Sequence, residues 1–438
     1  MTGRRPTSST TPSSIPSAAH RRVRATALSV VAMTACASLA AGCGVVPGLS
    51  ASTDDSIKVM TWAPQGTSAT NKPGMPAMAS AYIKWVNSQG GIHGHKLKLV
   101  TCNDHNSSVG AANCAQRAVD ENVVAVVGSY SQFGDSYFAP LEGAAIPYIG
   151  GYGASNEEFT SPVSYPVNGG SLTLLAGLGE ALADTCGPVT LVRPDSIAGD
   201  QLPQLLDSGL QAAGHAKAID QLAAEDLTEY DQQSQKALQS ASSDSGKTGC
   251  VVPELGDHTA TFMDSFQRAR QGRPAVKTAA EVGSVDQTVI NSTGGAGGPY
   301  EGSYITGWYP VASDSRWDEM KKVINEEAFG DNRIDPADAG VQTTWIAYQV
   351  LTAALEKIGD GEVSADSVRH TLNDGLKVST GGLTPSLSWP YQGKLAAAGF
   401  ARLVNADVNV QTVKSGLLQS ANKQALDMTK ILENADLS

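Results

Sequence analysis

Short apolar runs alternate with amphipathic segments along most of the chain from residue 57 onward. Residues 57–63 and 95–102 have the pattern of β-strands, and 123–128 form a continuous apolar run, typical of a strand covered on both faces. Residues 75–91 and 109–122 have apolar positions at helical spacing, and the first of these segments closes on two glycines, which helix C-termini favour. The pattern predicts alternating strands and helices.

The same rhythm recurs in the middle of the chain. Strands are expected at 188–194, 216–222 and 249–255. Helices are expected at 201–214, 230–241 and 259–271, and later at 316–328 and 343–359. The stretch 160–170, rich in Pro and Gly, is interpreted as a crossing between two sheets, and 387–413 as strand-like again. This order predicts an α/β fold with two doubly wound parallel-sheet lobes.

The first 43 residues have the pattern of an export signal. Three arginines (Arg21, Arg22 and Arg24) precede a short apolar run that ends in small residues. The ending, "LAAGC", resembles a bacterial lipobox, which implies lipidation at Cys43; the rival Cys36 lacks the small residue pair before it. An ordinary signal peptide or a single membrane anchor is the alternative. Residues 44–56 are then a flexible tether.

Composition limits the possible partners. The chain has 438 residues, of which 41% are hydrophobic, enough for two domains with large cores. The leader holds five arginines and no acidic residue, so the remainder has 26 basic and 43 acidic residues. Such a body repels nucleic acid and anionic lipid, and the membrane is expected to be reached only through the lipid anchor.

Four cysteines besides Cys43 lie in the body, and an even count outside the cytoplasm predicts two disulfides. Cys186 and Cys250 each stand just before a strand-like run, so they can pair if these strands are neighbours. The predicted pairing is therefore Cys102–Cys114 and Cys186–Cys250, although the sequence alone does not fix the connectivity.

Metal and enzyme chemistry find little support. His93, His95, Cys102 and His105 are close in sequence but lack the close ligand pairs of zinc sites. The chain has no G-x-S-x-G elbow, phosphate loop or dinucleotide fingerprint. Adjacent acids such as Glu157 and Glu158 are typical of a solvated loop. We expect no catalytic site, no metal and no cofactor.

The segment "VNSQGGIHGHKLKLVTCNDHNSSVGAANCAQRAVDENVVAVVG", with Asp104 at a characteristic position, resembles the type I periplasmic solute-binding proteins of the branched-chain amino-acid transport class. The tail "LSWPYQGKLAAAGF" is similar to the family's closing strand segment, whereas 203–299 match only in rhythm. The resemblance implies two lobes joined by three crossings, with ligand in the cleft between them. The expected lobes are N-terminal, 57–163 with 305–380, and C-terminal, 164–304 with 381–438.

Two strand-to-helix junctions are candidate ligand contacts, because ligands of open parallel sheets bind beyond the strands' carboxyl ends, near helix N-termini. In the first, "AVVGSYSQFGD", the resemblance implies that Ser131 binds a ligand carboxylate, with Ser129 as the near alternative and Tyr130 between them. In the second, the implied contacts are Gly153 with either Ala154 or Ser155. For each serine, a helix N-cap is the alternative role.

The resemblance also implies that Glu281 binds a ligand ammonium group; its alternative is a solvated acid at a strand end. The family's aromatic residues are missing near Asp195 and at Thr343, which favours a different, more polar ligand. Trp62 is a candidate apolar wall, with core packing as its alternative.

We therefore expect a monomeric, lipid-anchored, extracytoplasmic receptor of an ABC importer. Its partners would be an amino acid or similar small polar ligand and the importer's permease subunits, with no nucleic acid. The alternative is a sensor or surface interaction lipoprotein of the same fold without a transport role. A cell-wall enzyme is a third hypothesis.

Overall fold

The computed structural model describes residues 56–68, 70–196, 198–224, 227–242, 246–271 and 276–435. The predicted leader, the lipidation at Cys43 and all but the last residue of the tether lie outside the described residues. In the part that the structure describes, no helix is long and apolar enough to cross a membrane.

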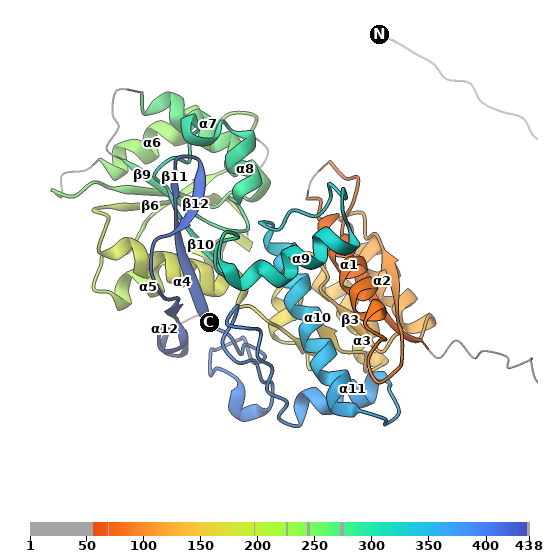
Figure 1. Cartoon of the computed structure of the whole chain (residues 1–438). Coiled ribbons are helices and arrows are strands. Elements are labelled where there is room, and N and C mark those ends of the chain that lie inside the picture. The colour runs from red at the N-terminus through yellow and green to blue at the C-terminus, as the bar shows by residue number, and fades with distance from the viewer. Residues whose placement is uncertain are drawn as a thin grey trace, which may run out of the picture. The chain divides into compact units, whose positions relative to one another are not determined.

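The N-terminal lobe is built on a parallel sheet in the order β2-β1-β3-β4-β5. Its strands are β1 (Ile57–Trp62), β2 (Leu97–Cys102), β3 (Ala125–Val127), β4 (Tyr148–Ile149) and β5 (Ser164–Tyr165). Its helices are α1 (Gly74–Ser88), α2 (Ser108–Asp120), α3 (Gly134–Gly143), α9 (Asp318–Glu327), α10 (Ala339–Ile358) and α11 (Ala365–Asn373). α1 packs against α9 and α10, and α2 packs against α3 (Figure 1). β3 is fully buried, as its uninterrupted apolar sequence predicted.

The C-terminal lobe is built on a larger sheet in the order β12-β11-β10-β9-β8-β6-β7, and β13 pairs with β11. Its strands are β6 (Val189–Pro194), β7 (Ile219–Ala223), β8 (Cys250–Pro253), β9 (Lys277–Glu281), β10 (Tyr304–Gly307), β11 (Asp407–Lys414), β12 (Leu417–Ser420) and β13 (Leu426–Asp427). β6 to β10 are parallel, and β11 to β13 are antiparallel to their neighbours.

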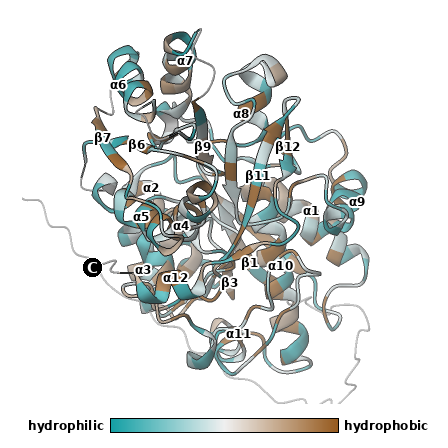
Figure 2. Cartoon of the chain, turned by 90° about the vertical axis from the view of Figure 1, so that its left-hand side faces the viewer, coloured by the Kyte–Doolittle hydropathy of each residue, from teal (hydrophilic) through white to brown (hydrophobic). Residues whose placement is uncertain are grey.

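Helices cover this second sheet. They are α4 (Gly170–Ala183), α5 (Leu202–Ala212), α6 (Asp231–Ala241), α7 (Thr259–Ala269), α8 (Gln287–Ser292) and α12 (Thr429–Asn434). α4 packs against α5, and α6 packs against α7. Figure 2 shows α6 and α9 mainly in hydrophilic colours, as expected for helices whose apolar stripe alone faces a core. The two doubly wound parallel-sheet lobes expected from the sequence are confirmed.

Three segments connect the lobes, and two lie slightly away from the predicted boundaries. β5 pairs with β4, so the chain leaves the N-terminal lobe after Tyr165 rather than at 163. β10 pairs with β9, so the chain returns after Gly307 rather than at 305. In both cases the strand pairs with its neighbour for a few residues beyond the boundary that was predicted from the apolar residues.

The third connection differs from the prediction, which was strand-like structure over 387–413. Residues 388–404 contain no extended strand; the strand of this region, β11, begins at Asp407. Trp389 instead lies fully buried against Tyr165, and its indole N–H donates to the carbonyl of Pro166. The segment therefore packs on the first connection between the lobes.

Both predicted disulfides, Cys102–Cys114 and Cys186–Cys250, are present. Cys102 ends β2 and Cys114 lies in α2. Cys186 lies three residues before β6, whose first residue, Val189, is in register with Cys250 of β8. Neighbouring parallel strands thus bring the second pair together, as the sequence argument required.

We predict that the two disulfides contribute unequally to stability. Cross-links restrict the unfolded chain more when they close longer loops, and the sequence separations are 64 for Cys186–Cys250 and 12 for Cys102–Cys114. Removing them as paired Cys→Ala variants should lower the free energy of unfolding by about 4 and about 3 kcal/mol respectively. Urea denaturation of both double variants tests this, and a larger loss for Cys102–Cys114 would contradict it.

Candidate functional site

A cavity of about 790 Å3, which we call the interlobe cleft, is lined by residues of both lobes. The N-terminal lobe contributes Thr70, Asn71, Lys72, Tyr130, Gln132 and Tyr152. The C-terminal lobe contributes, among others, Leu255, His258, Ser284 and Asp286. Most of these residues follow the carboxyl ends of β1, β3, β4, β8 and β9, where the loops of parallel sheets hold ligands.

Two tyrosines form the N-terminal wall of the cleft. The rings of Tyr130 and Tyr152 meet edge to face with centroids 5.0 Å apart, and Trp308 packs on Tyr152 from the other side at 5.2 Å. The Tyr130 hydroxyl accepts a hydrogen bond from the Gln132 amide at 3.0 Å. This cluster fixes a rigid aromatic surface on which an apolar or cationic group can rest.

Lys72 carries a positive charge into the cleft. Its ammonium lies 3.2 Å from the Asp338 carboxylate and 5.1 Å from the centroid of the Tyr152 ring. Burial alone lowers the pKa of Lys72, but the charges of Asp338 and Asp286 outweigh it, so that the pKa is raised well above its ordinary value. Asp286 and Asp338 are also the N-caps of α8 and α10. Lys72 is therefore charged and already paired.

Two buried glutamates lie just below the cleft surface of the C-terminal lobe. Thr278 of β9 is in register with Val251 of β8, so Glu281 and Glu254, three residues further on each strand, come side by side. The two residues are only 8% and 5% exposed. The Ser171 hydroxyl donates to Glu281 Oε1 at 2.8 Å, and the Ser284 hydroxyl donates to Glu254 Oε2 at 3.2 Å.

The second oxygen of each glutamate, Glu281 Oε2 and Glu254 Oε1, has no hydrogen-bond partner among the described residues. Burial raises the pKa of both carboxyl groups, and the charge of Glu281 raises that of Glu254 further. Two adjacent carboxyl groups cannot both ionise in a desolvated place without a counter-charge. The pair is therefore able to receive a positively charged group.

The first junction supplies its neighbours rather than its serines to the cleft. Ser129 and Ser131 are fully buried. The Ser129 hydroxyl accepts from the Trp62 amide at 3.1 Å, and the Ser131 hydroxyl hydrogen-bonds the Asp104 carboxyl. Tyr130, also predicted, does line the cleft.

The second junction is occupied by an acid of the chain itself. The backbone N–H groups of Gly153, Ala154 and Ser155 donate to the Glu158 carboxylate at 3.0, 2.9 and 3.3 Å. The Ser155 hydroxyl is buried against Gly134 at the start of α3. The donors expected to bind a ligand carboxylate are thus already bonded, and Glu158 is buried rather than part of a solvated face.

Three further candidates lie away from the cleft surface. Trp62 is fully buried and packs on Tyr137 and Tyr148 in the N-terminal lobe core. Thr343 is buried in α10, where it lies 3.0 Å from the Tyr309 hydroxyl. Asp195 follows β6 and is exposed. Of the predicted set, Tyr130 lines the cleft, and Glu281 lies behind the lining residue Gly283.

The metal-ligand interpretation of the histidines stays without support in the described residues, where no group of three or more His, Cys, Asp or Glu side chains is placed to hold a metal. Cys102 is in a disulfide, and His93 lies 3.6 Å from Asp360 on the surface. His93 and His105 adopt positive φ angles of 48° and 51° in turns that flank β2.

Lys72, Tyr152 and Glu254 were not among the residues predicted from the sequence. Glu254 had a usable signal, because it directly follows β8 and Glu281 is the last residue of β9. Lys72 and Tyr152 lie in loops whose course depends on tertiary packing, so no local pattern marks them.

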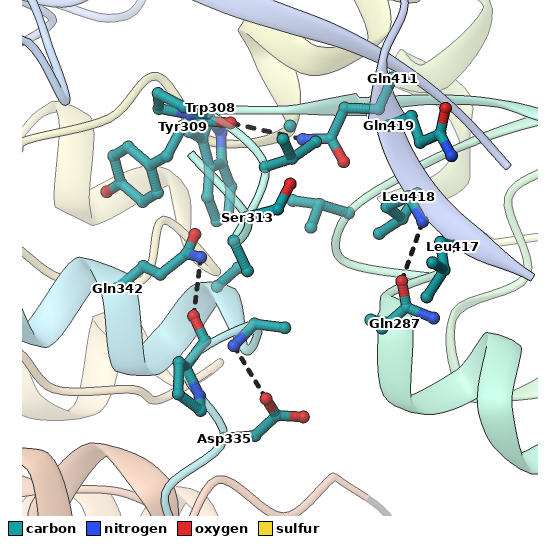
Figure 3. Close-up of a pocket in the computed structure, with 18 of the residues that line it drawn as sticks. Gln287, Trp308, Tyr309, Ser313, Asp335, Gln342, Gln411, Leu417, Leu418 and Gln419 are labelled. Atoms are coloured by element: carbon teal, nitrogen blue, oxygen red, sulfur yellow. Dashed lines mark hydrogen bonds between the residues drawn. The ribbon is translucent and has the colours of Figure 1, made fainter. Parts of the chain in front are cut away.

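A second cavity, of about 560 Å3, lies beside the connection Trp308–Ser313, and we call it the hinge cavity (Figure 3). Its lining includes Gln342 of α10 and Leu417 and Leu418 of β12. The glutamines there bind the chain: Gln342 donates to the Pro336 carbonyl at 2.9 Å, and Gln287 accepts from the Leu418 amide at 2.9 Å. Its lining also includes Lys321 and Asp335 and is otherwise mostly apolar, whereas the interlobe cleft combines Lys72 and Asp286 with two tyrosines.

The model of a family described as periplasmic binding protein matches residues 60–407. No curated protein matches the chain by sequence.

Among solved structures, a branched-chain amino-acid ABC transporter protein from Thermus thermophilus with bound valine is 13% identical, with a TM-score of 0.66 over 87% of this chain and 100% of the other. A solute-binding protein from Rhodopseudomonas palustris BisB5 in complex with 3,4-dihydroxybenzoic acid is 16% identical, with a TM-score of 0.65 over 86% and 98%. A fatty acid ABC transporter substrate-binding protein from Thermomonospora curvata is 13% identical, with a TM-score of 0.66 over 88% and 96%.

We predict that Glu158 is required for stability. Glu158→Ala leaves three N–H donors of the second junction without their acceptor, and should lower the free energy of unfolding by about 2 kcal/mol or more. The exposed Glu319→Ala in α9 is the control and should change it by less than about 0.5 kcal/mol. Urea denaturation measures both, and equal effects would contradict the assigned role.

We also predict a pH dependence from the glutamate pair. Burial raises the pKa of Glu281 from 4.5 to about 7, so the folded state holds this proton more tightly than the unfolded state does. The free energy of unfolding should therefore fall as the pH rises from about 4.5 through about 7, by on the order of 3 kcal/mol. Glu281→Gln should remove this part of the slope in urea denaturation at pH 5, 6, 7 and 8. A variant curve parallel to that of the unmodified protein would contradict the prediction.

Proposed function

Because the chain belongs to the periplasmic binding protein family, we propose that it is the solute receptor of an ABC importer and binds an amino acid or similar small polar molecule in the interlobe cleft. The family consists of binding proteins, so the chain is a solute-binding protein and not an enzyme. Its family also implies an extracytoplasmic location.

The observation that carries the proposal is the composition of the cleft. Charged and aromatic groups of both lobes face one cavity, with Lys72 and Tyr152 on one side and Ser284 and Asp286 on the other. One contact between the lobes is the hydrogen bond from the Thr288 hydroxyl to Asp335 at 2.8 Å. A solute that contacts both walls would stabilise the closed arrangement of the lobes by its extra contacts there.

The neighbours give a range of ligand types rather than one ligand. The similar structures hold valine or dihydroxybenzoic acid, or come from a fatty acid transporter. The same two-lobed fold thus serves zwitterions, aromatic acids and long apolar acids. The ligand of this chain must be argued from its own cleft residues.

The proposal includes attachment to the membrane and binding to permease subunits. Export by the leader and lipidation at Cys43 would hold the receptor at the outer face of the membrane. The receptor would act as a monomer, and the permease subunits of an importer would bind its closed form. A sensor without a permease would use the same cleft, and loss of solute uptake on deletion of the gene separates the two roles.

We predict that a cleft ligand stabilises the protein. At a hundredfold excess over its dissociation constant, the ligand should raise the free energy of unfolding by roughly 2.7 kcal/mol. A thermal-shift screen against amino acids, amides, ureas, amines and small aromatic acids measures this. Tyr152→Ala should abolish the shift, because it removes the aromatic wall, whereas the surface variant Tyr391→Ala should keep it; Tyr391 is 87% exposed.

A screen in which no compound of any class raises the melting temperature would contradict the receptor role. So would a hit that is equally strong in Tyr152→Ala, because its site would lie elsewhere.

A further inference from the structure

The carboxyl groups around the cleft outnumber its cations. Glu254, Glu281, Asp286 and Asp338 lie in or directly below the cleft, and Lys72 is the lysine that lines it. In the part of the chain that the structure describes, no ion pair joins Glu254 or Glu281 to a lysine or arginine, whereas Lys72 is bonded to Asp338. Even with the glutamate pair protonated, Asp286 and Asp338 outnumber Lys72, and ionisation of the pair adds negative charge that attracts cations.

The glutamate pair is built as an acceptor. Each member is more than nine-tenths buried, each uses one oxygen for a serine hydroxyl, and each keeps one buried oxygen without a partner among the described residues. A buried acceptor oxygen that makes no hydrogen bond lowers the stability of the protein. These two oxygens therefore indicate that the ligand brings the missing hydrogen-bond donor. Glu281 and Glu254 stand at the ends of the neighbouring strands β9 and β8. A single ligand with several N–H donors can therefore reach both carboxyl groups.

A glycine leaves room between the pair and the cleft. Gly283 and Ser284 line the cavity, and a Cβ atom added at Gly283 would lie 3.2 Å from Glu281 Oε1. The Ser284 hydroxyl, on the same wall, bonds Glu254. The absence of a side chain at Gly283 therefore leaves the Glu281 carboxyl group uncovered at this point of the wall, on the side of Oε1, the oxygen that also binds Ser171.

Donors for a ligand carboxylate are scarce in the same place. The three amides of the second junction bind Glu158, and the Ser131 hydroxyl binds Asp104. Lys72 binds Asp338. An acidic or zwitterionic ligand would have to compete with these internal carboxylates for the same donors, or use the side chains of Asn71 and Gln132, which also line the cleft.

We propose that the cleft takes a small organic cation without a carboxylate, an alkyl amine or a guanidinium or amidinium compound, whose N–H groups bind the free oxygens of Glu254 and Glu281. The apolar part of the ligand would lie on the faces of Tyr130 and Tyr152, where cations are also favoured. Bidentate N–H donors suit paired carboxylate oxygens better than a point charge does. The inference rests on the proposed function, because it names the ligand class of the same cleft.

Calorimetric titration of the purified full chain with agmatine, putrescine, benzamidine, leucine and benzoate tests the proposal. At least one of the three cations should bind, and leucine and benzoate should bind at least tenfold more weakly or not at all. Glu254→Gln and Glu281→Gln should each weaken cation binding at least tenfold.

Glu180→Gln is the matched control. Burial raises its pKa and its Oε2 also lacks a partner among the described residues, but it lies about 13 Å along α4 from Ser171. It should leave cation binding unchanged.

A measurement on the unmodified protein covers the case in which a Gln variant fails to fold. The surroundings of the pair are Ser171 of α4, Ser284 of the β9–α8 loop and the two carboxyl groups themselves, with Lys72 and Asp286 in the cleft beyond. A bound cation favours the ionised pair, so affinity should rise between pH 6 and pH 8. An affinity that is independent of pH in this range would overturn the proposal.

Two other results would distinguish failure of the cation assignment from failure of the receptor role. Binding of leucine or benzoate that is insensitive to Glu254→Gln, or failure of all three cations to bind, would overturn the cation assignment while leaving a receptor role intact. Absence of binding by every compound of the wider thermal-shift screen would instead remove the proposed function.

Discussion

The architecture depends on one geometric constraint: parallel strands direct all their carboxyl ends to the same edge of a sheet. Each lobe therefore presents a row of loops at one edge, and the cleft collects residues from the loops after β1, β3, β4, β8 and β9. Lys72 of the N-terminal lobe and Asp286 of the C-terminal lobe, far apart in sequence, line the same cleft because these two edges face each other. The two glutamates owe their contact to the same constraint, since β8 and β9 are adjacent and in register.

Competition for hydrogen-bond donors decides what such an edge can bind. Free backbone N–H groups after a parallel strand favour an acceptor oxygen of a ligand, but here the Glu158 carboxyl group, whose pKa burial raises to about 8, already accepts from three of them. Asp104 takes the Ser131 hydroxyl in the same way. Across the cleft the situation is reversed, because the free groups there are acceptors on Glu254 and Glu281. Internal acids thus shift the cleft from anion binding toward cation binding.

The sequence predicted the lobes because the information is local. Apolar runs such as 123–128 and the glycine pair after α1 mark buried strands and helix ends whatever surrounds them. The Cys186–Cys250 bridge followed from strand order, whereas Glu281, the last residue of β9, was named from the resemblance to the family. Trp62 and Ser129 could not be assigned correctly, since the same strand-end position can point into a core or a cleft. Glu158 was taken for a solvated acid because its three partners form a turn that only the fold creates.

We propose that the ligand binds in the interlobe cleft, at the glutamate pair. A crystal structure of the protein with its tightest-binding solute tests this directly. The account predicts the solute between Tyr152 and Ser284, with a nitrogen about 3 Å from free oxygens of Glu254 and Glu281 and the lobes closed on it. A solute bound in the hinge cavity beside Leu418, or one whose carboxylate has displaced Glu158 from the second junction, would contradict it.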